Sequence, residues 1–159
     1  YPDRLVDICS FSRIKPMVNQ VEVHPFYQQE EAKKWMDKYS VQIEAWAPFG
    51  EGRGNMFQNP VLNEIGKKYG KSAAQVILRW HLQRGVVVIP KSTHIERMQE
   101  NLNVFDFALS AEDMARIAAL DTKMSAFFSH YDPAKVEWFA NMVEERKKNH
   151  DSTKEKKDW

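Results

Sequence analysis

Cationic and hydroxyl side chains follow a run of β-branched residues in the second half of the chain. The run Val86-Val87-Val88-Ile89-Pro90 leads directly into Lys91-Ser92-Thr93, and Arg97 comes one helical turn later. Where a strand meets a helix N-terminus, free backbone N–H groups and the helix dipole favour an anion. Lys91 adds a point charge and Arg97 a planar donor. The pattern predicts an anion-binding site.

Glu100 and Asn101 stand three and four residues after Arg97, on the same face of the predicted helix. Their carboxylate and carboxamide could accept and donate hydrogen bonds to a heteroaromatic amine. The alternative is a capped surface helix with ordinary ion pairs. The spacing alone leaves both interpretations open.

Two earlier strand ends carry aromatic and amide side chains. Trp46 precedes Ala47-Pro48-Phe49-Gly50, where an indole could stack on a flat ring, or could be an ordinary core tryptophan. Asn19 and Gln20 are adjacent, so one faces each side of its strand, and a buried carboxamide needs a ligand or backbone partner. His24 precedes Pro25 and is interpreted as a turn residue.

The elements that position these residues alternate between strand and helix periodicity. Predicted strands cover residues 17–23, 41–46 and 86–90, the last apolar throughout and therefore expected to be covered on both faces. Residues 49–58 predict a loop. Helices are expected over 2–11 and 28–39, with further starts signalled by Asn59-Pro60, Ser72-x-x-Gln75, Thr93-x-x-Glu96, Ser110-x-x-Asp113 and Asp132-Pro133.

This alternation indicates an α/β fold with a parallel sheet built from βαβ crossovers. Three strands leave two open edges, so we expect something else to continue the sheet. The helix that follows Asp132 is expected to end near Lys148, with residues 149–159 as a charged, disordered tail.

Composition excludes several classes of protein. The 159 residues carry a net charge of +1, too little for a strong overall field toward nucleic acid or an acidic membrane, and the basic stretch 146–157 is interleaved with acids. Cys9 is the only cysteine, so neither a disulfide framework nor a cysteine zinc site is possible, and the histidines show no metal spacing. With no signal-like start and no apolar run of about 18 residues, we expect a cytoplasmic protein.

Three segments give the chain a specific resemblance to the aldo-keto reductases, over about residues 1–121. The Ile-Pro-Lys-Ser stretch, followed at this spacing by Arg and Glu-Asn, is highly specific. The loop that contains Phe127-Phe128-Ser129-His130 is similar to bacterial members near the diketogluconate reductase type. The matching segments are Val18-Asn19-Gln20-Val21-Glu22-Val23-His24-Pro25, Ala45-Trp46-Ala47-Pro48-Phe49-Gly50, and residues 84–101.

The resemblance implies a (β/α)8 TIM barrel, of which this chain holds roughly strands six to eight within residues 1–148, and NADPH/NADP+ as cofactor. Gln20 would then hydrogen-bond the nicotinamide carboxamide, and Trp46, in place of the usual Tyr, would stack on the nicotinamide ring. Ala47 replaces a common Ser and removes a possible phosphate contact. The pyrophosphate would pass Phe49 (usually Leu), Gly50 and Gly52.

The remaining implied contacts favour NADPH over NADH. Lys91, Ser92, Thr93 and Arg97 would hold the adenosine 2′-phosphate, with Arg97 also stacking on adenine. Glu100 and Asn101 would read the adenine amino edge. These implied roles agree with the anion site expected from charge and helix geometry.

The family's catalytic Asp, Tyr, Lys and His have no counterpart in this chain, so the resemblance implies no catalytic residue here and no turnover by the chain alone. The implied function is NADPH-dependent reduction of an aldehyde or ketone by a complete, monomeric enzyme. The alternative is a non-catalytic NADPH-binding or regulatory protein derived from the same fold. By itself, the chain is expected to self-associate or to need the missing strands.

Overall fold

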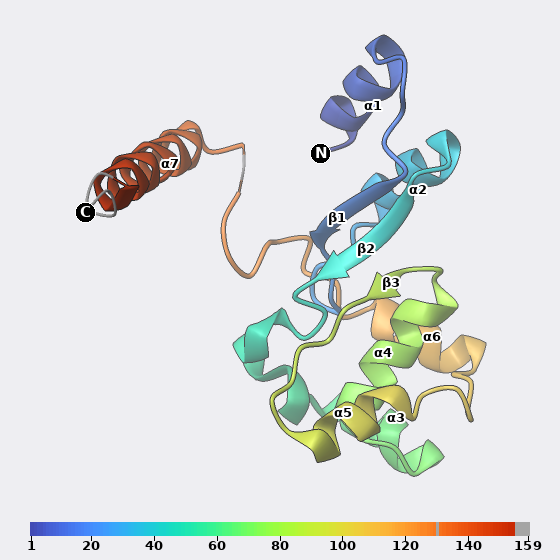
Figure 1. Ribbon diagram of the computed structural model, residues 1–159. Helices are drawn as coiled ribbons and strands as arrows, with labels where there is room; N and C mark the ends of the chain where they lie inside the picture. Colours follow the sequence, from blue (N-terminus) through green and yellow to red (C-terminus); the bar gives the residue numbers. More distant parts are fainter. Residues whose placement is uncertain (130, 155–159) are drawn as a thin grey trace. The chain divides into compact units, whose positions relative to one another are not determined.

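The computed structural model describes residues 1–129 and 131–154 and divides into two units (Figure 1). The first unit is Tyr1–Ala126 and contains the sheet and most helices. The second begins at Phe127, and its described part contains helix α7 (Pro133–Lys154). Each unit is described by itself below.

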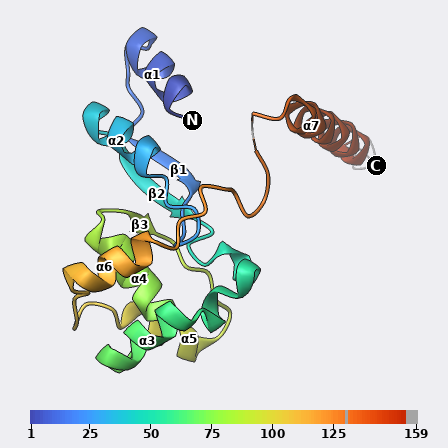
Figure 2. The ribbon, with the colours of Figure 1, turned by 180° about the vertical axis from the view of Figure 1, so that it is seen from behind.

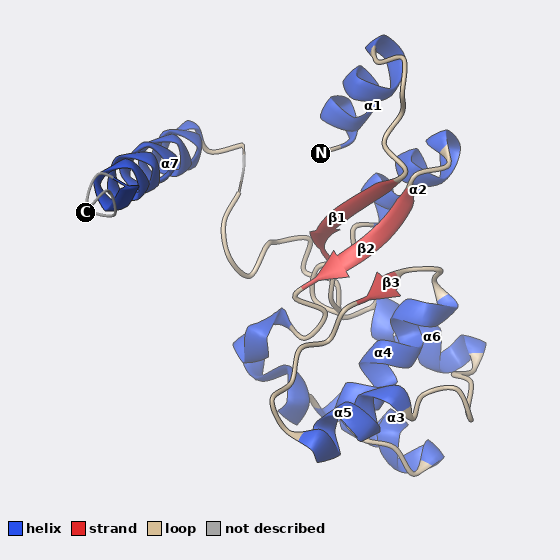
Figure 3. Ribbon diagram, in the orientation of Figure 1, coloured by secondary structure: helices blue, strands red, loops and turns tan. Residues whose placement is uncertain are grey.

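The first unit is built on a parallel sheet in the order β1-β2-β3 (Figure 3). Val18 pairs with Gln42 at one end of the first two strands and Glu22 pairs with Trp46 at the other. This register brings the carboxyl ends of neighbouring strands to one edge, where ligands of parallel sheets gather. The strands are β1 (Val18–Glu22), β2 (Gln42–Trp46) and β3 (Val87–Val88).

Helices follow the strands as the sequence predicts. Helices α1 and α2 lie toward the β1 side of the sheet, and α3 to α6 lie toward the β3 side (Figures 1 and 2). The predicted α/β class with a parallel sheet is confirmed. The helices of this unit are α1 (Pro2–Phe11), α2 (Glu30–Tyr39), α3 (Pro60–Tyr69), α4 (Ala73–Gln83), α5 (Ile95–Leu102) and α6 (Ala111–Ala118).

Side-chain caps fix most of the helix starts that the sequence indicates. Asn59 accepts a hydrogen bond from the Leu62 N–H, and Pro60 occupies the first turn of α3. Ser72 and Gln75 form both hydrogen bonds of a capping box at the start of α4. Ser110 accepts from the Asp113 N–H. These local signals were sufficient because each cap satisfies backbone donors within its own turn.

The capping box predicted from Thr93 to Glu96 is wrong. The N-cap of α5 is His94, which makes no side-chain cap, and Ser92 Oγ instead accepts from the His94 N–H at 3.1 Å. The helix therefore begins one residue later, with its first N–H groups not capped by a side chain. This leaves a helix N-terminus open toward the segment that carries Lys91.

The strand predicted over residues 86–90 is also shorter than expected. Only Val87 and Val88 form β3, and Val87 and Ile89 are 41% and 51% exposed. The expectation that both faces are covered is therefore wrong for this chain. Within the described residues no strand pairs with the outer edge of β3, and α5 buries none of its side chains.

The loop predicted over residues 49–58 contains short helical turns. The 3₁₀ segment η1 (Gly50–Gln58) is interrupted by left-handed residues, among them the non-glycine residues Glu51 and Asn55. Gly50 has a φ of +57°, which side chains rarely adopt, and a Cβ there would also meet Met56 Cε at 3.2 Å. The segment is therefore a compact, shaped loop.

Helix α7 extends further than the sequence indicates. It begins at Pro133 as expected but continues to Lys154, so the expected end near Lys148 is wrong for residues 149–154. The remainder of the predicted tail, 155–159, lies outside the described residues. The division of the chain at residue 148 stays a prediction.

The core of the first unit lies between the sheet and the helices that follow its strands. Apolar side chains of β2 and α4 form its centre, including Ile43, Ala45, Ile77 and Trp80, each at most 1% exposed. Burial of such side chains is the main driving force for folding. The carboxyl ends of the strands are thereby held above a packed base.

Candidate functional site

A pocket of about 670 Å³ opens where the starts of α4 and α5 meet η1. It brings together eight of the twelve residues that the family resemblance assigns to the cofactor. Those eight are Phe49, Gly52, Lys91, Ser92, Thr93, Arg97, Glu100 and Asn101. The other seven residues that line it are Glu51, Phe57, Asn63, Ser72, Ala73, Ala74 and His94.

The pocket's cations have no partners of their own. Among residues 1–129 and 131–154, neither Lys91 nor Arg97 forms an ion pair or a hydrogen bond, although four lysines and arginines elsewhere pair with carboxylates at 2.6–2.8 Å. Both side chains are exposed beside the uncapped start of α5. Two positive charges and a helix dipole there can hold a multiply charged anion.

Glu100 enters the pocket in a fixed position. Ser72 Oγ donates a hydrogen bond to Glu100 Oε1, and Gln75 Nε2 donates to the Glu100 carbonyl at 3.1 Å. Asn101 lies beside it and lines the same pocket. A carboxylate and a carboxamide held at one wall can accept and donate hydrogen bonds to a polar heterocycle.

Four of the twelve expected residues do not line this pocket. Gln20 Nε2 instead donates to Glu44 Oε1 at 2.5 Å, across β1 and β2. Trp46 is half-buried at the end of β2, and Ala47 follows it in a left-handed turn with a φ of +50°. Gly50 is buried under the loop. Their assignment to a nicotinamide site therefore stays a prediction.

Three of the seven lining residues that the sequence analysis did not assign to the site come from the start of α4. The Ser72 signal correctly marks a helix start, but nothing local indicates that this start faces the start of α5. Asn63 and Phe57 reach the pocket from α3 and η1 in the same way. A contact between segments so distant in sequence is visible only in the folded chain.

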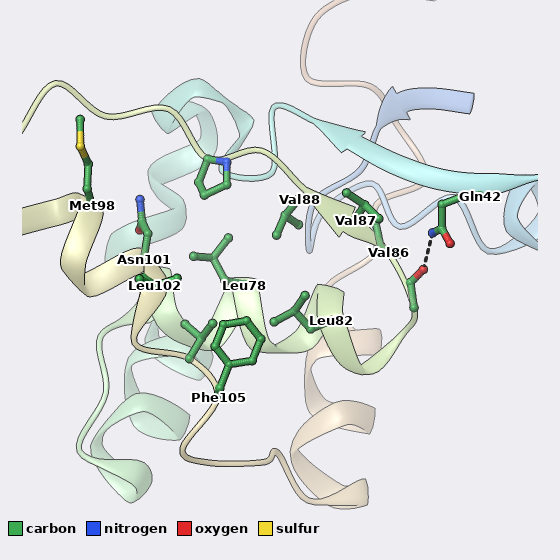
Figure 4. A pocket seen from close by; sticks show the side chains of 13 residues that line it. Gln42, Leu78, Leu82, Val86, Val87, Val88, Met98, Asn101, Leu102 and Phe105 are labelled. Carbon is green, nitrogen blue, oxygen red and sulfur yellow. Dashed lines mark hydrogen bonds between the residues drawn. The ribbon is translucent and has the colours of Figure 1, made fainter. Parts of the chain in front are cut away.

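A second hollow, of about 550 Å³, is lined by residues of α4, α5 and the β3 strand (Figure 4). No charged side chain lines it, and Asn101 lines both hollows. Figure 4 shows Leu78 and Leu82 of α4 turned toward Phe105 and the β3 strand. The lining residues are Gln42, Leu78, Leu82, Gly85, Val86, Val87, Val88, Pro90, Met98, Asn101, Leu102, Val104 and Phe105, together called the apolar groove.

A buried polar cluster ties the end of β1 to residues 125–126. Glu22 Oε1 accepts from His24 Nε2 at 2.9 Å and from the Ala126 N–H at 2.8 Å, and Glu22 Oε2 accepts from Ser125 Oγ at 2.5 Å. Arg53 Nη1 of η1 donates to the Ala126 carbonyl at 3.4 Å. His24, interpreted from the sequence as a turn residue, is thus also a buried hydrogen-bond donor.

Two ionisable groups near this cluster have shifted pKa values. Burial alone would raise the pKa of Glu22, but hydrogen bonds from His24, Ser125 and Ala126 outweigh it and hold that pKa below its ordinary value of 4.5. Burial and the Arg84 charge lower the pKa of His81 to about 3. His81 is therefore neutral at ordinary pH, and Glu22 is ionised.

Two further searches of the described residues found no candidates. No group of three or more His, Cys, Asp or Glu side chains among them could hold a metal ion. Of the helices in the part of the chain that the structure describes, none has the length and apolar character needed to cross a membrane.

A parallel α/β unit with a pocket beyond the strand ends that holds two unpaired cations is an arrangement that many nucleotide-binding proteins share. Comparison with known proteins makes this specific, since the model of the Aldo/keto reductase family matches residues 2–122. The chain belongs to the aldo/keto reductase family.

Curated relatives agree over the same region. The chain is 46% identical over 121 residues to the 9,11-endoperoxide prostaglandin H2 reductase of Trypanosoma cruzi, covering 76% of this chain and 43% of that protein. It is 49% identical over 117 residues to the glyoxal reductase of Bacillus subtilis, covering 74% and 42%. The chain thus spans about two fifths of the length of the curated relatives it matches.

Solved structures confirm the fold of the matched part. An aldo/keto reductase from Brucella melitensis has a TM-score of 0.71 at 39% identity, covering 76% of this chain and 46% of that one. A Bombyx mori aldo-keto reductase in complex with NADP has a TM-score of 0.74 at 30% identity, covering 80% and 44%. A further aldo-keto reductase complexed with NADPH has a TM-score of 0.74 at 32% identity, covering 79% and 41%.

Replacing Glu22 by Gln is expected to reduce the pH dependence of stability. Because the folded-state pKa of Glu22 lies below its unfolded value, its ionised form stabilises the fold fully above about pH 5, and this contribution disappears as the pH falls through the folded-state pKa. At pH 7 we expect Glu22→Gln to lower the free energy of unfolding by about 1–3 kcal/mol, measured by urea unfolding.

The matched control is Glu112→Gln, which changes an exposed carboxylate on α6. It should keep the wild-type loss of stability between pH 7 and pH 4, whereas Glu22→Gln should show a smaller loss. Equal losses for both variants would contradict the role assigned to Glu22.

Proposed function

We propose that this chain is the cofactor-binding part of an NADPH-dependent aldo/keto reductase that reduces aldehydes or ketones to alcohols. The observation that carries the proposal is the pocket where unpaired Lys91 and Arg97 flank the uncapped start of α5. Sequence relatives and solved structures of the same family, some of them holding NADPH or NADP, support it.

The pocket residues fit the polar ends of such a cofactor. Lys91, Arg97 and the first N–H groups of α5 would hold the 2′-phosphate, with the Ser92 and Thr93 hydroxyls beside them. Glu100 and Asn101 would receive the adenine edge. Gly52 and Phe49 of η1 would border the pyrophosphate, because glycine permits the closest approach of the backbone.

The nicotinamide end rests on weaker support. Trp46 and Ala47 stand at the end of β2, as a stacking platform requires, but Gln20 is hydrogen-bonded to Glu44 and would have to exchange that partner for the cofactor amide. When bound, NADPH supplies a hydride from C4 of its nicotinamide to the carbonyl carbon of the substrate. The residues of this chain bind and orient it.

The proton donor to the carbonyl oxygen would come from outside this chain. In the complete enzyme we place the family's Asp, Tyr, Lys and His on strands that precede those seen here, with β1 to β3 as about strands six to eight of the barrel. A second candidate function is a non-catalytic NADPH-binding or regulatory protein.

The relatives support a proposal for the class of substrate. Relatives include a glyoxal reductase and a methylglyoxal reductase, and one similar structure is described as a putative 2,5-diketo-D-gluconic acid reductase B. We propose a small carbonyl substrate and a diketogluconate-reductase-like member of the family. We also propose a cytoplasmic enzyme that binds neither nucleic acid nor membranes and is monomeric when complete.

Titration with NADPH and NADH, followed by quenching of Trp fluorescence, tests the 2′-phosphate site. We expect Lys91→Ala and Arg97→Ala each to weaken NADPH binding by about tenfold or more, because each removes a charge-assisted contact, and to leave NADH nearly unchanged. Lys67→Ala and Arg4→Ala, exposed cations away from the pocket, are the matched controls. Equal affinity of the wild type for both dinucleotides would contradict the assignment of the 2′-phosphate site.

The chain alone is expected to show no reductase turnover. Methylglyoxal added to the purified 159-residue chain with NADPH should cause no oxidation of NADPH, because no tetrad counterpart supplies the proton. The measurement is the loss of NADPH absorbance over time. Oxidation that depends on methylglyoxal and disappears with Lys91→Ala would contradict this expectation.

We also propose that the isolated chain self-associates unless the missing strands are supplied. Neither outer edge of the sheet is paired within the described residues, and apolar side chains are exposed at both, including Met17 at 82% and Leu102 at 72%. Unpaired edges beside apolar surface favour association.

Sedimentation velocity over a range of concentrations tests self-association. Met98→Glu places a charge in the apolar groove and should shift the chain toward monomer. Met124→Glu, at an exposed site outside the groove, should not. A wild-type monomer at every concentration would show that the proposal is wrong.

A further inference from the structure

Helix α5 carries Arg97, Glu100 and Asn101 of the pocket, yet it buries none of its side chains. Apolar packing therefore does little to position it. Its C-terminal half is held instead by the first turn of α4, through hydrogen bonds that reach both the side chain and the backbone of Glu100.

Ser72 has two separate tasks in this arrangement. Its Oγ accepts the Gln75 N–H at 3.3 Å, which begins α4, and its hydroxyl hydrogen is donated to Glu100 Oε1. Gln75, which is 6% exposed, completes the clamp: its Nε2 donates to the carbonyls of Glu100 at 3.1 Å and Asn103 at 2.9 Å. The capping box of one helix thus fixes the other helix.

The hydrogen bond from Ser72 leaves half of the Glu100 carboxylate available. Oε1 is taken by the hydroxyl, whereas Oε2 has no partner among the described residues. Glu100 and Ser72 both line the pocket, so a group that binds there can donate a hydrogen bond to this second oxygen. An ionised carboxylate accepts and never donates, so it selects a ligand that presents an N–H donor.

We propose that Ser72 is a positioning residue that sets base specificity, by holding Glu100 so that its free oxygen receives the exocyclic amine of an adenine. This inference rests on the proposed NADPH function and adds to it a residue that does not itself touch the reacting atoms. A base with a carbonyl in place of the amine puts an acceptor against the carboxylate and is rejected.

The test compares NADPH with its hypoxanthine analogue, in which a carbonyl replaces the adenine amine, by fluorescence titration of the whole chain. We expect the wild type to prefer NADPH by about tenfold or more. Ser72→Gly should reduce this preference to about twofold or less, because the hydroxyl that holds Glu100 is gone. Glycine is nearly as good as serine at an N-cap, so α4 should still form.

The chain offers a matched control in Ser110, which caps α6 in the same way but lies outside the pocket. Ser110→Gly should lose the same kind of cap and keep the full preference for NADPH. Ser72→Thr retains a hydroxyl donor and should restore most of the preference. A general loss of stability would lower both dinucleotide affinities together and leave their ratio unchanged.

The outcomes separate this inference from the function on which it rests. If the wild type binds NADPH with the preference stated and Ser72→Gly keeps that preference, the role of Ser72 is wrong while the proposed function stands. If the wild type binds NADPH and its analogue equally, the role of Ser72 is likewise wrong and the proposed function stands. If the wild type binds neither dinucleotide, both proposals fail.

Discussion

The hydrogen bonds between the first turn of α4 and Glu100 are the interaction on which the pocket depends. Helix α5 carries Arg97, and Lys91 lies in the segment just before its uncapped N-terminus, but the helix buries no apolar side chain of its own. Without the hydrogen bonds from α4, α5 would be loosely held and its charged side chains would have no fixed positions. Ser72 and Gln75 belong to the first turn of α4, which packs into the core. Their hydrogen bonds to Glu100 therefore fix the pocket to the core.

The two hollows that α5 helps to line differ in the polarity of their linings. The pocket lies toward η1 and the starts of the helices, whereas the apolar groove lies toward the outer edge of β3. A parallel strand with apolar side chains is normally covered on both faces and paired on both edges. Among the described residues, β3 is paired on one edge only, with β2.

Local signals in the sequence predicted most of the elements. The caps at Asn59 and Ser72 and the change of period between strands and helices depend on neighbouring residues, so a sequence contains them. That Lys91 and Arg97 lie together beyond a strand was also predictable, and both line one pocket; their role as an anion site stays a prediction. Thr93 failed as a cap because the neighbouring Ser92 hydroxyl already receives the His94 N–H, a choice between adjacent hydroxyls that spacing does not decide.

Contacts between distant segments were not predictable. The sequence contains nothing to say that Ser72 meets Glu100, or that the buried Glu22 binds residues 125 and 126. The exposure of Val87 and Ile89 likewise reflects what is absent beside β3, whereas their side chains alone indicate a covered strand.

The hydrogen bond from Arg53 to the Ala126 carbonyl has a consequence for engineering. This hydrogen bond joins loop η1 to residues 121–126, and Glu22 accepts a hydrogen bond from the Ala126 N–H of the same segment. If only one of the two segments is replaced by that of a related enzyme, the residue that it contacts in the other segment is not replaced with it. Chimaeras that exchange residues 50–58 and 121–126 as one block should therefore tolerate transplantation better than those that exchange either alone.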